Sequence, residues 1–340
     1  MSKLLSPKVL VPVAIVVVVV IVQNLLSLPG VVLPEISIPA EEVFSLFGFP
    51  ITNTLLSAWF TMLLLIVVAW LITRKMKTVP GRWQGLLEML IEGFYNLVEN
   101  TAGPKWTPKF FPIVMTIFLF VITSSWLGLT PLFGSWGALH HAEGEGHPVI
   151  WVGEGHSLGI LVKEADAPEA EAAEAGGEHE EGGHYVLAPM FRAATTDMNF
   201  TVALALVSVT LTQYFGVMAL GVGYFGKFIG IGGIIKAFTK PGLGCGGRIG
   251  AFFMGIIDIF IGIVETISEI GKVISFSFRL FGNIFAGEVL LGVMAFLIPY
   301  VISLPFFGLE LFVGVVQALV FMMLTVAFFV VAVSGHGEGH

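Results

Sequence analysis

Long runs of apolar residues alternate with polar connections along most of the chain. Uninterrupted or nearly uninterrupted runs occupy 9–22, 51–72, 110–133, 198–222, 251–298 and 301–334. Most of these runs are long enough to cross a hydrocarbon core of roughly 30 Å as a helix, and each is limited by charged residues, proline or glycine. The period-two alternation that a membrane barrel needs is missing from them. The pattern predicts an all-α polytopic membrane protein.

The composition agrees with this class. Hydrophobic residues make up 56% and charged residues 12% of the 340 residues, whereas a soluble domain carries about 45–50% apolar and about 25% charged residues. The single cysteine, Cys245, excludes a disulfide within the chain and a cysteine metal cluster. We expect it to be a small loop residue, and we predict no cofactor.

Basic residues orient the runs by the positive-inside rule. The connections 29–50 and 134–197 are acidic and hold only Lys163 and Arg192 as bases, so we expect them to face outward. The remaining connections should be cytoplasmic. Their basic residues are Lys3 and Lys8 before the first run, Arg74, Lys75, Lys77, Arg82, Lys105 and Lys109 between the second and third, and Lys227, Lys236, Lys240 and Arg248 between the fourth and fifth.

The first run, 9–22, is open to two interpretations. Two lysines precede it, as they would in a signal peptide or a signal anchor. No small-x-small cleavage site is obvious near Ser27, so we predict a retained, additional N-terminal helix.

Residues 83–102 predict an amphipathic helix. Apolar residues from Leu86 to Val98 fall on one face, whereas Glu88 and Glu92 fall on the other. A helix on the cytoplasmic membrane surface explains this pattern, and packing on a partner explains it equally well.

The segment 137–184 is rich in Ala, Gly, Glu and His and predicts a solvated, partly disordered insert, because such a composition buries little apolar surface. Its histidines leave open a zinc-binding or pH-responsive segment, although HEEGGH (179–184) lacks the HExxH spacing. We divide the chain into 1–49, 50–134, 135–196 and 197–340.

The fifth run carries an unusual set of polar residues. It has no proline from Gly250 to Ile298, so a continuous helix would be about 73 Å long and must tilt, break or extend into the cytoplasm. Successive spacings of 7, 4, 3, 7 and 4 place six polar residues on one narrow helical stripe. They are Asp258, Glu265, Glu269, Lys272, Arg279 and Asn283.

Arg279 is the residue of this stripe that most strongly indicates function. A guanidinium deep in a bilayer is costly, and it cannot shed its charge by deprotonating. Glu288, nine residues on, falls on the opposite face of the helix, and in the last run Glu310 and Gln317 share a face. Two aqueous half-paths separated by an arginine would move protons without a leak. Alternatively, such charges pair internally, Glu269 with Lys272 for instance, and hold helices together.

Several segments resemble one family. FSFRLFGNIFAGE, followed by VGVVQALVFMMLT (313–325), looks like the two closing helices of subunit a of the F-type ATP synthase membrane sector. TDMNFTVALAL (196–206), GYFGKF (223–228) and TNTLLSAWFTMLLL (52–65) resemble its earlier segments. The similarity covers most of the chain from about residue 50 and excludes 1–40 and 137–184.

The resemblance implies five family helices, the last two forming a long tilted hairpin, and it assigns roles. Arg279 matches the arginine that keeps the rotor carboxylate ionised and separates two proton half-channels. Glu288 matches the outward acid, Glu310 a position that cooperates with it, and Glu265 a cytoplasmic acid. The remaining matches are Asn283 and Gln317 near the arginine, and Asp197 and Asn199 at the outward mouth.

The resemblance also implies partners: a ring of c subunits, b-type peripheral stalk subunits, the other ATP synthase subunits and the bilayer, with no nucleic acid. We expect a multi-pass protein of a bacterial-type plasma membrane. No Walker sequence GxxxxGK[ST] occurs, so no catalytic nucleotide site is expected. The alternatives are a sodium-translocating version of the same subunit, an unrelated secondary transporter, which would show paired repeats, and a membrane scaffold. Protons are preferred, since no cluster of oxygen ligands is evident in the runs.

Overall fold

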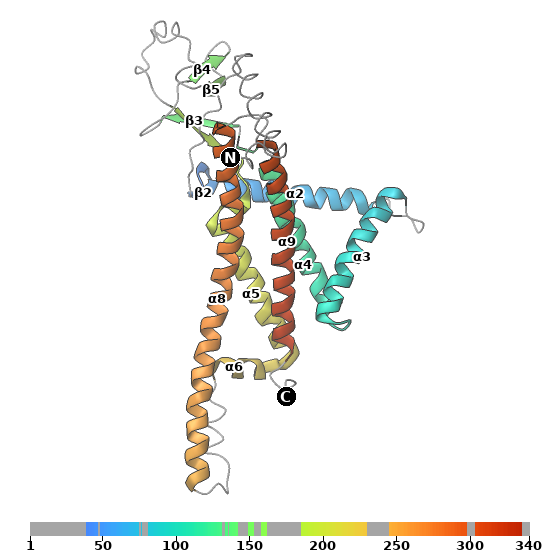
Figure 1. The fold of residues 1–340 in the computed structure, drawn as a ribbon, viewed down its shortest axis with the longest axis vertical. Coiled ribbons are helices and arrows are strands. Elements are labelled where there is room, and N and C mark those ends of the chain that lie inside the picture. Colours follow the sequence, from blue (N-terminus) through green and yellow to red (C-terminus); the bar gives the residue numbers. More distant parts are fainter. Residues whose placement is uncertain are drawn as a thin grey trace, which may run out of the picture. The chain divides into compact units, whose positions relative to one another are not determined.

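Five long apolar helices dominate the computed structural model (Figure 1). The structure describes residues 39–46, 48–74, 76, 81–130, 133–134, 136–141, 149–152, 158–161, 185–229, 245–297 and 303–334. Within these residues, five helices are long and apolar enough to cross a membrane. They are α2 (Asn53–Thr73), α4 (Thr107–Gly128), α5 (Met198–Leu220), α8 (Cys245–Leu297, apolar from Phe253) and α9 (Ser303–Val333).

The prediction of a polytopic helical membrane protein is therefore confirmed in its main part. Each of the last five apolar runs forms a helix, because a helix satisfies its own backbone hydrogen bonds where water is absent. The first run, 9–22, and with it the predicted additional helix, lies outside the described residues.

Helix α8 is a single unbroken helix of 53 residues. At about 1.5 Å per residue it is about 80 Å long. Of the three possibilities that the sequence left open, a break is excluded, whereas tilt and extension beyond the bilayer remain.

Helix α3 (Arg82–Ala102) confirms that the amphipathic segment is helical. It ends at Gly103, whose φ of 74° is in the region that favours glycine and whose N–H donates to the Glu99 carbonyl. Phe94 and Tyr95 pack against Phe118 and Phe111 of α4, with ring centroids 4.6 and 5.2 Å apart. Part of the apolar face thus contacts another helix of the same chain, while Leu90 and Ile91 beside it are exposed.

The chain forms two compact units. The first comprises Met1–Trp59, Ser124–Thr196 and Asn283–Gly314, and the second comprises Phe60–Thr123, Asp197–Gly282 and Val315–His340. In the second unit, the rings of Phe110, Phe215 and Phe329 lie 4.8 to 5.1 Å apart and join α4, α5 and α9. Phe276 of α8 packs on Phe321 of α9 at 4.8 Å, so aromatic contacts join α8 to α9 as well.

Short antiparallel strand pairs lie in the connections between the predicted helices. β1 (Glu42–Leu46) pairs with β2 (Phe49–Thr52), β3 (Gly137–His141) with β6 (Tyr185–Pro189), and β4 (Val149–Val152) with β5 (Leu158–Leu161). The first residues of the insert 137–184, which form β3, are therefore paired with β6, the strand that directly follows the insert. A ladder needs only backbone groups in register, so a composition poor in apolar residues does not prevent it.

The predicted metal-binding alternative for this insert finds no support in the described residues, which contain no group of three His, Cys, Asp or Glu able to hold a metal ion. His140 and His141 belong to β3, and the other four histidines of the insert lie outside the described residues.

Short 3-10 helices and one short α-helix also occur among the described residues. η2 (Ala194–Thr196) precedes α5, and η3 (Gly221–Phe225) and α6 (Gly226–Ile229) follow it.

Candidate functional site

Arg279 lies on α8 without an ion-pair partner in the part of the chain that the structure describes. Its Nη2 donates to Oγ of Ser275, one turn earlier, over 3.4 Å. Its neighbours on either side differ, since Phe278 is exposed and Leu280 is buried. Arg279 therefore stands at the boundary between a packed and an open face of the helix.

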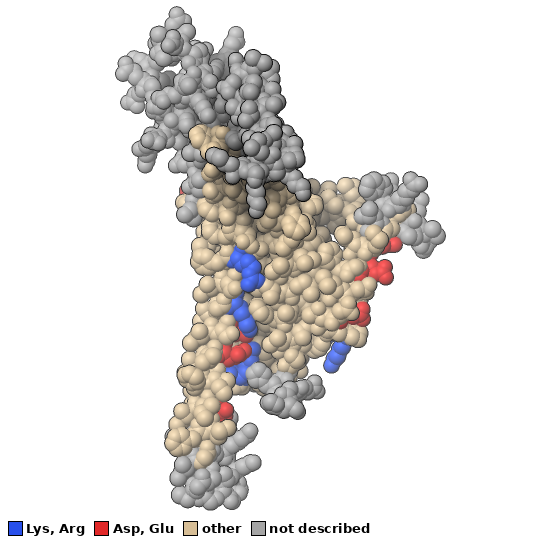
Figure 2. All heavy atoms as spheres, viewed as in Figure 1, with Lys and Arg blue, Asp and Glu red and all other residues tan. Residues whose placement is uncertain are grey.

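The open face of α8 is a stripe of large apolar residues. Helix geometry places Phe278 in line with Ile267 and Phe260, and all three are exposed. Arg279 lies about 100° around the helix from Phe278, at the edge of the polar stripe. Figure 2 shows charged atoms gathered in a column beside α8, with uncharged atoms around them. On this face of the molecule, the charged atoms thus form a narrow column within an otherwise apolar surface.

Glu288 forms an ion pair with Arg192. Nε of Arg192 lies 3.2 Å from Oε1 of Glu288, and Nη2 lies 3.3 Å from Oε2. The arginine side chain is 9% exposed and the glutamate side chain 45%. Sequence reasoning missed this role, because it counted Arg192 only as one of two bases in an acidic outward segment. The rarity of basic residues in the segment 134–197 was the one sequence signal that pointed to Arg192.

Glu310 is buried and lies against Gly287. A Cβ at residue 287 would overlap the Glu310 carboxylate, so Gly287 leaves room for this side chain in its observed position. Since Gly287 precedes Glu288, the helices bring the two predicted outward acids to adjacent positions of one unit.

The other predicted polar residues lie in different surroundings. Gln317 is buried on α9, two turns after Glu310, and Asn283 is exposed on α8, one turn after Arg279. Asp197 is the N-cap of α5, and its Oδ1 accepts a hydrogen bond from the N–H of Asn199 over 2.9 Å. Asp197 therefore has a structural role as a helix cap, whatever else it does.

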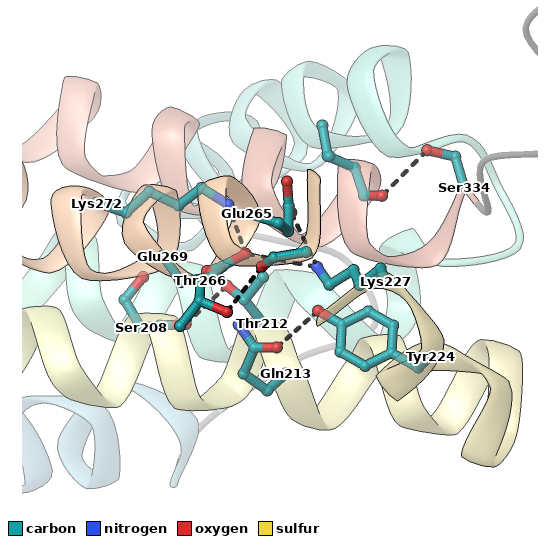
Figure 3. A network of polar contacts seen from close by, with 12 residues as sticks. Ser208, Thr212, Gln213, Tyr224, Lys227, Glu265, Thr266, Glu269, Lys272 and Ser334 are labelled. Atoms are coloured by element: carbon teal, nitrogen blue, oxygen red, sulfur yellow. Dashed lines mark hydrogen bonds and ion pairs between the residues drawn. The ribbon is translucent and has the colours of Figure 1, made fainter. Parts of the chain in front are cut away.

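A second charged cluster surrounds the predicted cytoplasmic acid (Figure 3). Lys227 Nζ lies 3.4 Å from Oε1 of Glu265 and 3.5 Å from Oε1 of Glu269. Lys272 Nζ lies 2.8 Å from the same Glu269 oxygen, which is the internal pairing that the sequence left open. Two lysines thus balance two carboxylates.

Lys227 reaches this cluster because η3 and α6 fold back onto α8. Tyr224 is buried, and its hydroxyl donates to Oε1 of Gln213 on α5 over 2.7 Å. At α8, a Cβ on Gly262 would overlap the carbonyl oxygen of Phe228, so only glycine permits this approach. Sequence reasoning used Lys227 for orientation alone and did not predict its contacts.

The pKa of Lys227 reflects these neighbours. Burial alone lowers it, but the polar contact with Tyr224 and the negative charges of Glu269 and Glu265 outweigh burial. The pKa of Lys227 is therefore raised above its ordinary value of 10.5, and the side chain is cationic at neutral pH.

Comparison with known proteins decides the family. A family model described as ATP synthase A chain matches residues 55–330. The chain belongs to this family. ATP synthase subunit a of Gloeobacter violaceus is 29% identical to it over 288 residues, which cover 85% of this chain and 86% of the relative. ATP synthase subunit a of Moorella thermoacetica is 27% identical over 295 residues, which cover 87% and 97%.

Membership in the ATP synthase A chain family confirms the resemblance drawn from the sequence. The chain is a multi-pass membrane protein and a subunit of the ATP synthase membrane sector, where it takes part in proton transport and ATP synthesis. The matched range includes nearly all of α2 and the whole of α4, α5 and α8.

Proposed function

We propose that the chain forms two proton half-channels against a rotating ring of c subunits and couples proton flow to rotation. The observation that carries this proposal is Arg279, a permanent cation on a membrane-crossing helix that has no ion-pair partner in the described residues. A charge on a membrane-crossing segment needs a counter-charge, so we infer that a carboxylate of another subunit supplies it.

Arg279 suits the barrier between two half-channels. A guanidinium keeps its proton in proteins, so it attracts a carboxylate and cannot itself relay protons. The exposed apolar stripe that includes Phe278 gives the ring a surface on which to pass Arg279. The partner is thus a ring subunit that presents an acid within an apolar helix.

The acids on the two sides of Arg279 in the sequence form the proton paths. On the outward side these are Glu288 and Glu310, which the fold brings to adjacent positions, with Asp197 and Asn199 at the mouth. On the cytoplasmic side it is Glu265, held by Lys227. Asn283 and Gln317 supply polar groups near the arginine.

The remaining assignments follow from the family. The chain is a non-catalytic subunit, and its further partners are b-type peripheral stalk subunits and the other subunits of the complex. Its location is a bacterial-type plasma membrane. The transported ion is the proton.

The test is ATP-driven proton pumping by the whole complex in membrane vesicles, followed by quenching of a pH-sensitive dye. Arg279→Ala should abolish pumping while the complex remains assembled. Arg74→Ala is the matched control, because Arg74 is an arginine at the end of α2 that stacks over Trp70, and it should pump normally. Normal pumping by Arg279→Ala would refute the barrier.

A further inference from the structure

Backbone hydrogen bonds hold the loop that carries Arg192, independently of the contacts of the Arg192 side chain. On one side, the N–H of Gly134 donates to the Phe191 carbonyl over 3.0 Å, and the N–H of Met190 donates to the Trp136 carbonyl over 2.9 Å. The rings of Phe133 and Phe191 lie 5.5 Å apart. These contacts anchor the loop to the segment that follows α4.

The start of α2 anchors the same loop from another direction. Nδ2 of Asn53 donates to the Pro189 carbonyl over 3.2 Å, and the backbone N–H of Arg192 donates to Oγ of Ser57 over 3.1 Å. The Ser57 hydroxyl in turn donates to the Asn53 carbonyl over 3.0 Å, which fixes its direction. The Cα position of Arg192 is therefore determined without any contribution from Glu288.

From this fixed point the Arg192 guanidinium extends to α8. Nε and Nη2 face the two oxygens of Glu288 at 3.2 to 3.4 Å, and the guanidinium carbon lies 5.9 Å from the centre of the Phe285 ring, one turn earlier. The nitrogen–oxygen distances are about 0.5 Å longer than the 2.7 to 2.9 Å that is typical of a tight charge-assisted hydrogen bond. The pair thus orients the carboxylate but leaves it partly open to solvent.

We propose that Arg192 is a positioning residue for proton transfer, which holds the Glu288 carboxylate in place and balances its charge. This inference rests on the proposed role of Glu288 as the outward acid. Because the loop is anchored by its backbone, the guanidinium is not needed to hold the loop. The ion pair therefore restrains the side chain of the more exposed partner, Glu288. A carboxylate free to swing would spend less time aligned with the next acceptor.

The experiment measures ATP-driven proton pumping by the whole complex for four variants: Arg192→Met, Arg192→Lys, Glu288→Gln and the control Arg74→Met. Arg192→Met should lower pumping per assembled complex by roughly tenfold or more. Arg192→Lys, which restores the positive charge, should recover most of it. Wild-type pumping by Arg192→Met, or equal loss in both Arg192 variants, would overturn the proposal.

Two further outcomes separate this inference from the proposed function. If Glu288→Gln pumps normally, the outward role of Glu288 fails; if Glu288→Gln is blocked but Arg192→Met is normal, only the positioning role fails.

Should Arg192→Met fail to assemble, the double variant Arg192→Met with Glu288→Gln decides. Removing both charges should restore assembly, because no unpaired carboxylate remains. Equally poor assembly of the double variant would show a purely structural role and refute the proposal.

Discussion

Nζ of Lys227 lies 3.4 Å from Oε1 of Glu265 and thereby joins the short helix α6 to the long helix α8. Both side chains are partly buried, and the lysine also lies 4.3 Å from the centre of the Tyr224 ring. The acid for which we propose a role in the cytoplasmic proton path is thus paired with a base that lies 38 residues earlier in the sequence.

Removing the Lys227 charge should impair pumping. Lys227→Met leaves Lys272 as the remaining cation of the cluster against Glu265 and Glu269, and an uncompensated, partly buried carboxylate is costly. We expect pumping per assembled complex to fall, with Lys227→Arg close to wild type, when dye quenching is measured on vesicles. Full pumping by Lys227→Met would show that the cluster is dispensable.

The same lysine predicts a pH dependence of stability. Its folded pKa is raised, so its contribution to stability is complete below 10.5 and is lost as the pH rises through the folded value. The thermal stability of the purified complex should therefore differ between wild type and Lys227→Met at neutral pH. The difference should shrink above pH 10.5. A difference that stays constant across this range would contradict the assignment.

Gly262→Ala should push α6 away from α8. The added Cβ would overlap the Phe228 carbonyl oxygen, which belongs to the backbone and cannot turn aside. Overpacking of this kind typically costs about 1–3 kcal/mol. Gly271→Ala, on the same helix, is the matched control, because a Cβ at that position meets nothing within 4 Å. Accumulation in the membrane and thermal stability of the complex should fall for the first variant alone; equal behaviour would refute the packing.

Gly287→Ala should disturb the two outward acids. The new Cβ would occupy the position of the Glu310 carboxylate and displace it. We expect a marked loss of pumping in an assembled complex. Gly308→Ala, where a Cβ meets nothing within 4 Å, should leave pumping unchanged. If both variants pump equally well, Glu310 does not need its observed position.

Features that depend on residues close together in the chain could be predicted from the sequence. Hydrophobic length alone predicted the last five apolar runs as helices, because a membrane-crossing helix satisfies its hydrogen bonds internally. The polar stripe of α8 and the place of Arg279 in it followed from the helical repeat, and no proline interrupts that helix. The family resemblance rested on the same contiguous segments.

Contacts between residues of distant segments became known from the three-dimensional fold. Arg192 precedes Glu288 by 96 residues, and no periodicity links a loop to a helix face at that separation. The slot that Gly287 leaves for Glu310 depends on how closely two helices pack, and the paired ends of the insert depend on strand register. Helical spacing is a local property of the backbone, whereas these contacts arise from packing, to which the whole chain contributes.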